Sequence, residues 1–123
     1  MNALDKADAL KERTKQFAIR IVAVSRSLPR SREAHVVAKQ LLRSGTAVAA
    51  NYRAVCRARS KAEFISKISI VVEEADETVF WLELLGDTGL APAAKLALLL
   101  KEANELVAIC AASLRTAKNN KEV

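Results

Sequence analysis

The carboxylates between residues 73 and 83 are the residues best suited to chemistry in this 123-residue chain. On bundle helices, carboxylates can hold two metal ions, but such sites also need a Glu-x-x-His motif on two helices. The chain has one histidine, His35, and no acid precedes it at that spacing. We therefore predict no metal and no cofactor, and expect a solvated face or ion pairs. The acids are Glu73, Glu74, Asp76, Glu77 and Glu83.

Other catalytic patterns are equally absent from the sequence. It holds no glycine-rich dinucleotide loop, no P-loop and no Ser-His-Asp arrangement. His35 falls in the first turn of a predicted helix, where we expect a surface position. Cys56 and Cys110 lie in apolar helical surroundings without a ligand pattern, so we expect buried free thiols in a reducing cytosol. We predict a cytoplasmic protein that is not an enzyme, with neither a secretory signal nor a membrane span.

Basic residues gather directly before the acids. Residues 29–59 carry seven Lys or Arg and one acid, whereas residues 60–90 carry two Lys or Arg and seven acids. Two interpretations of the basic set stay open. It is either solvated charge that pairs with the acids, within the chain or between subunits, or a phosphate-binding surface. The candidate phosphate-binding residues are Lys39, Arg43, Arg53, Arg57, Arg59 and Lys61.

Hydrophobic spacing predicts four long helices that would position these charges. Apolar residues recur three and four positions apart over about 3–28, 32–57, 61–85 and 92–118, as in bundle helices. The connections are short, so consecutive helices must be antiparallel neighbours. We predict an all-α, up-down-up-down four-helix bundle, with residues 1–118 as one domain and 119–123 as a disordered tail.

Local signals mark the ends of these helices. Pro29 ends the first helix, and Ser31 is suited to cap the second. Ser60 and Glu63 have the spacing of a capping box that opens the third. Gly86 is suited to the left-handed position that would end it. These start and stop signals favour four separate helices.

Two features of the middle helices indicate close contacts, and the second of them indicates a contact beyond a single bundle. Gly45 weakens its helix by about 1 kcal/mol relative to alanine, so we expect a neighbouring backbone to approach it closely. The third helix carries an apolar row opposite its core side, which a helix buried on one side does not need. With nearby acids, this row is the candidate oligomer interface: Ile70, Glu74, Glu77, Trp81 and Leu84.

Three stretches of the sequence form one long motif: QLLRSGTAVAANYR at residues 40–53, SKAEFISKI at 60–68 and EADETVFWLELL at 74–85. It closely resembles the "four helix bundle protein" family, that of the 23S rRNA intervening-sequence proteins. These are encoded within insertions in bacterial 23S rRNA genes or as free-standing genes. The resemblance implies a homopentamer around a central channel, with no established catalytic residues to transfer. The accessory protein of diversity-generating retroelements looks like a relative; it is pentameric and basic, and binds nucleic acid and a reverse transcriptase.

Together, the pattern and the resemblance predict a non-catalytic, ring-forming protein. Acids of the third helix could face a neighbour's basic helix, and such heterologous contacts close into rings. The partners expected are further copies of the chain and structured RNA or DNA, contacted through phosphates without base readout. The alternative is a structural oligomer that docks a protein partner and binds no nucleic acid. Salt-dependent retention on nucleic acid would separate the two.

Overall fold

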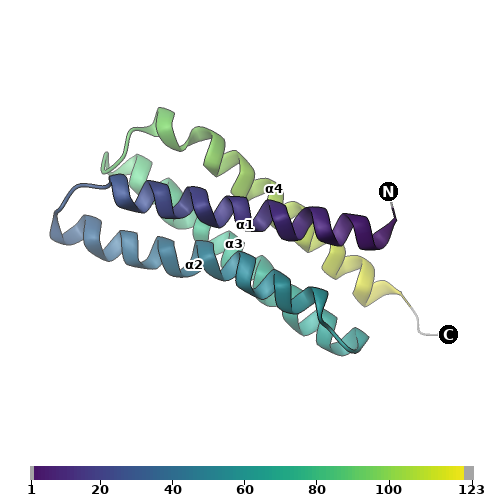
Figure 1. Cartoon of the computed structure of the whole chain (residues 1–123). Coiled ribbons are helices and arrows are strands. Elements are labelled where there is room, and N and C mark those ends of the chain that lie inside the picture. Colours follow the sequence, from purple (N-terminus) through teal and green to yellow (C-terminus); the bar gives the residue numbers. More distant parts are fainter. Residues whose placement is uncertain (1, 121–123) are drawn as a thin grey trace.

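Four antiparallel helices make up the computed structural model, which describes residues 2–120. They are α1 (Ala3–Ser27), α2 (Arg32–Cys56), α3 (Lys61–Asp87) and α4 (Ala93–Asn119), in an up-down-up-down order (Figure 1). The described residues contain no strand. The predicted all-α bundle is confirmed, whereas its assembly into a ring stays a prediction. Of the tail predicted over 119–123, residues 121–123 lie outside the described residues.

The helix starts follow the expected caps. The side chain of Ser31 accepts a hydrogen bond from the Ala34 amide at 3.2 Å, and Ser60 accepts one from Glu63 at 3.0 Å. The predicted end of α3 is wrong, because the helix continues through Gly86 to Asp87. The positive φ of 73° falls at Gly89 instead, where a residue without Cβ adopts it without strain.

All four helices contribute to the core, and α1 packs closely against α2 at Gly45. Ile21 is fully buried there, and a Cβ built on Gly45 would lie only 2.7 Å from two carbons of its side chain. A neighbouring helix does pack closely on Gly45, but the expected approach of a backbone is wrong, because the nearest atoms belong to the Ile21 side chain. On the other side of α2, the buried hydroxyls of Ser44 and Thr78 lie 2.9 Å apart and hydrogen-bond across to α3. This polar pair links α2 to α3 inside the bundle, and each hydroxyl also lies within hydrogen-bonding distance of a backbone carbonyl of its own helix, Leu41 for Ser44 and Glu74 for Thr78.

α1 and α4 contact each other less than the other neighbouring helices do, and in Figure 1 α4 crosses behind α1 at an angle. One ion-pair cluster joins them. Arg13 donates to both carboxylate oxygens of Glu102, at 2.7 and 2.6 Å, and to Glu105 at 2.7 Å. The hydrogen bond from Arg13 lowers the pKa of Glu102 against the opposing effect of burial. None of the described helices is apolar enough over a sufficient length to span a membrane.

Glu102→Gln should weaken the bundle at neutral pH but not in acid. A carboxylate whose pKa is lowered on folding stabilises the protein above its unfolded pKa of about 4.3, and that stabilisation is lost as the pH falls through the folded value. We expect the variant to lose about 1 kcal/mol at pH 7, a modest value because Arg13 is partly solvent-exposed. Urea unfolding at pH 7, 5 and 3.5 measures this difference. A difference that stays constant across these pH values would contradict the assignment.

Candidate functional site

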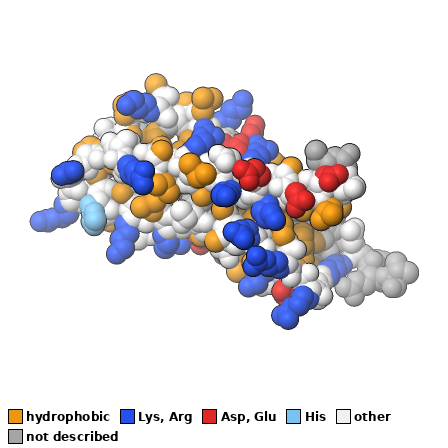
Figure 2. Space-filling view, in the orientation of Figure 1, with side chains coloured by type: hydrophobic (Ala, Val, Ile, Leu, Met, Phe, Trp, Pro, Cys, Tyr) orange, Lys and Arg blue, Asp and Glu red, His pale blue; other side chains and the backbone are white. Residues whose placement is uncertain are grey.

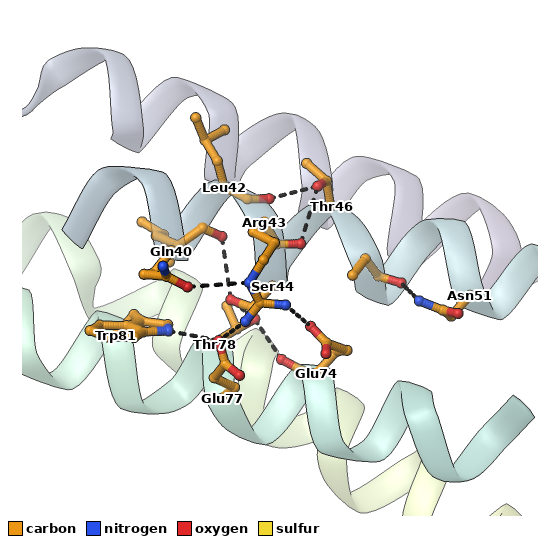
Figure 3. Close-up of polar contacts among 12 residues, drawn as sticks. Gln40, Leu42, Arg43, Ser44, Thr46, Asn51, Glu74, Glu77, Thr78 and Trp81 are labelled. Atoms are coloured by element: carbon orange, nitrogen blue, oxygen red, sulfur yellow. Dashed lines mark hydrogen bonds and ion pairs between the residues drawn. The ribbon is translucent and has the colours of Figure 1, made fainter. Parts of the chain in front are cut away.

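Arg43 is held by acids of its own chain. Its guanidinium donates to Glu74 at 3.0 Å and also pairs with Glu77, both on α3 (Figure 3). The Trp81 indole donates to Glu77 at 3.0 Å. That bond, followed by the one from Arg43, lowers the pKa of Glu77 despite some burial. Of the two pairings considered, within the chain or between subunits, Arg43 forms the one within the chain, and this pairing compensates its charge.

Two further predicted basic residues also have partners within the chain. Arg59 lies 3.5 Å from Glu63, and Lys61 donates to the backbone carbonyl of Asn120. The Arg59 side chain is largely exposed, so this ion pair is weak. Among the described residues, Lys39, Arg53 and Arg57 are exposed and form no ion pair, which leaves their charges available to an external anion.

Arg53 and Arg57 border a groove of about 590 Å³ between α1 and α2. Lys11 and Lys15 of α1 line its other side, so cations from two helices face one hollow. Between them lie the short side chains of Thr46, Ala49 and Ala50. We call the four cations the groove cluster. Its arginines were predicted from the sequence, whereas its lysines were not.

Two carboxylates partly neutralise the positive charge of the groove cluster. Asp8 lies 4.0 Å from Lys11, at the limit of an ion pair, and both side chains are well exposed. Glu12 lines the groove and accepts a hydrogen bond from Gln16 at 2.9 Å. With four cations and these two acids, the groove keeps a net positive charge. Figure 2, which views the α1–α2 side, shows blue side chains gathered over this region.

The two cysteines differ in their exposure to solvent. Cys110 is buried, and burial raises the pKa of its thiol to about 11. Cys56 is exposed, so its predicted burial is wrong. It is the last residue of α2 and lines a small hollow with Lys11, Arg53 and Arg57, at the end of the helix where less structure covers it. No group of three or more potential metal ligands occurs within residues 2–120.

The apolar row predicted for the oligomer interface is only partly exposed on the surface of its own bundle. Ile70, Trp81 and Leu84 are all half-buried, and the last two pack against the core of their own bundle. The neighbouring Phe80, which the sequence did not single out, is 52% exposed. Its ring packs edge-on against Trp81, with the ring centres 4.9 Å apart. The role of the row in assembly stays a prediction.

Comparison with known proteins places this fold in a family. Residues 8–112 match the family model described as "23S rRNA-intervening sequence protein". The chain belongs to this family. The match includes all four residues of the groove cluster, the whole of α2 and α1 from residue 8 onward.

A solved structure supports the same placement of this intervening-sequence protein. A protein with unknown function from the S23 ribosomal protein family of Bacteroides thetaiotaomicron shares 34% sequence identity and superposes with a TM-score of 0.82. The similarity covers 89% of this chain and 98% of the Bacteroides chain. No curated protein matches the chain significantly. Family membership therefore identifies the fold, and the surface residues are the remaining evidence on function.

Proposed function

We propose that this 23S rRNA-intervening sequence protein is a non-catalytic, cytoplasmic scaffold that assembles into a ring and binds structured RNA or DNA. The groove cluster supports the nucleic-acid part of this proposal. Arg53 and Arg57, like Lys11 and Lys15, are four residues apart, so each pair presents two charges about 6 Å apart along one side of its helix. Small side chains between the pairs allow a polyanion to approach the protein surface closely.

The groove suits phosphates better than bases. Lysine and arginine contacts to the backbone are independent of sequence and supply most non-specific affinity. Binding to single strands usually adds aromatic side chains on which bases stack. Here Tyr52 is buried, Trp81 is half-buried and hydrogen-bonded to Glu77, and the exposed Phe80 lies on α3 and does not line the groove. We therefore propose recognition of charge and shape.

A binding titration tests this function. Wild-type protein would be added to a fluorescently labelled RNA hairpin and to a DNA duplex, each at several salt concentrations. We expect affinity to fall steeply as salt rises, because each neutralised phosphate releases counterions. Absence of binding at the lowest salt concentration would contradict the proposal.

Ring assembly would strengthen such binding, since the positive potentials of several grooves add. Its proposed contacts are the row Ile70, Trp81 and Leu84. Trp81→Ala should lower the mass measured by light scattering more than it lowers helicity. Wild-type protein that stays near 13.4 kDa at micromolar concentrations would contradict the ring, as would a variant of unchanged mass.

The exposed ring of Phe80 favours a second candidate function, docking of a protein partner. Phe80 lies on an outward face of α3 among exposed acids, which suits a basic and partly apolar partner. Under this alternative the protein binds no nucleic acid, and binding to a cationic amphipathic peptide depends on Phe80. The acids are Glu73, Asp76 and Glu83.

A further inference from the structure

A second group of cations lies at the other end of the α1–α2 face. Arg26, Arg32 and Lys39 are exposed and form no ion pair with any described residue, and Arg30 lies in the loop between the helices. We call these four residues the loop-end cluster. Glu33 is the acid nearest to them in sequence, so this cluster also carries a net positive charge.

Helix geometry places both clusters on one face. At 100° per residue, Arg32 and Lys39 fall within about 60° of Arg53 and Arg57 around α2. Around α1, Arg26 falls within about 60° of both lysines of the groove cluster. A single long ligand lying along this pair of helices could therefore contact both clusters.

The surface between the clusters carries no uncompensated cation among the described residues. Ile19 and Val22 of α1 and Leu42, Thr46 and Ala50 of α2 occupy intervening positions. Arg43 also lies between the clusters on α2, but Glu74 and Glu77 of α3 pair with it and compensate its charge. In Figure 2, blue side chains gather towards the two ends, with mostly orange and white surface between them. The face thus has two separate anion-binding regions.

The distance between these regions is comparable to the length of one helical turn of a nucleic-acid duplex. Lys39 and Arg53 are 14 residues apart on α2, or about 21 Å, and the outermost pair, Arg32 and Arg57, is about 38 Å apart. One turn of duplex DNA is about 34–36 Å long, and its backbones return to the same side within that length. α2 is one continuous helix, so this spacing is fixed.

We propose that the ligand of this face is a base-paired duplex of at least about one turn, whose backbone contacts the two clusters while a groove faces the middle, where the only arginine is compensated by Glu74 and Glu77. The inference rests on the proposed function and deepens it by naming the class of nucleic acid. The affinity of a flexible single strand would not rise abruptly at one length, because such a strand can bend to reach both clusters. A duplex shorter than the gap would contact only one cluster at a time.

The test measures affinity against duplex length at fixed salt. Labelled duplexes of 6, 10, 14 and 20 base pairs, and single strands of matching lengths, would be titrated with wild-type protein. The loop-end variant is Arg32→Glu with Lys39→Glu, and Arg32→Gln with Lys39→Gln is its milder form. The matched control, Lys95→Glu with Lys101→Glu, changes two exposed lysines of α4. Circular dichroism confirms the helicity of each variant.

We expect wild-type affinity to rise at least tenfold between 6 and 14 base pairs, well beyond the gain from extra binding positions. The loop-end variants should lose this step and bind 14 base pairs like 6, while the control keeps it. A gain only proportional to length, equal binding of single strands, or an unchanged step in the loop-end variants would overturn the duplex assignment. Failure of wild-type protein to bind any nucleic acid would instead overturn the proposed function itself.

Discussion

Gly45→Leu is expected to destabilise the protein by about 3 kcal/mol or more, the upper part of the range for overpacked cores. Helix propensity alone predicts the opposite sign, a gain of up to about 1 kcal/mol, because leucine is the better helix former. The steric effect dominates because even the first added carbon would lie 2.7 Å from the fully buried Ile21. Urea unfolding followed by circular dichroism measures the change.

Gly86 provides a matched control for this prediction. It also lies within a helix, α3, but a Cβ there would meet only Leu96 Cδ1, at an ordinary contact distance of 3.7 Å. Gly86→Ala should therefore leave stability unchanged or raise it, while Gly45→Ala falls between the two. A melting temperature raised by Gly45→Leu would show that α1 does not pack against this position.

Arg53→Glu combined with Arg57→Glu is expected to lower nucleic-acid affinity at least 100-fold at moderate salt. A charge-assisted hydrogen bond contributes about 1.5–3 kcal/mol, so losing two corresponds to a factor of 100 or more. Reversal adds repulsion from the phosphates. Fluorescence anisotropy with a labelled duplex measures the loss, and circular dichroism should show unchanged helicity because both side chains are exposed.

The choice of residues in that variant follows from the ion pairs. Arg43 is left intact because replacing it would leave Glu74 and Glu77 without their cation and confound binding with stability. Lys95→Glu with Lys101→Glu gives the same change in net charge on α4 and serves as the control. Equal loss of affinity in both variants would mean that net charge, rather than the groove, determines binding.

Hydrophobic spacing predicted the core well on helices whose buried residues form a single row. On α4 the spacing predicts a buried row of Leu96, Leu99, Ala103, Leu106 and Cys110, followed by Ser113 or Leu114. The first five are buried, and the last two are half-buried. α3 was harder, because apolar residues are spread around most of this helix and their spacing does not single out one buried row. Its buried residues Val71, Thr78 and Leu85 were therefore missed.

The basic face was predicted only in part for a related reason. Residue types on α2 showed the arginines, but a sequence does not state which side of α1 lies beside them. Lys11 and Lys15 have the four-residue spacing that could have indicated a shared face. Their relation to Arg53 and Arg57 needed the packing of α1 on α2, which the contact of Ile21 with Gly45 fixes.

The most direct test of the proposed function is the slope of log affinity against log salt concentration, measured for wild-type protein and for Arg53→Glu with Arg57→Glu on the same duplex. Each phosphate contact contributes about −0.9 to the slope on duplex DNA. We predict a steep negative slope for wild type and one shallower by about 1.8 per engaged subunit for the variant. Identical slopes, or a wild-type affinity independent of salt, would contradict phosphate binding by this groove.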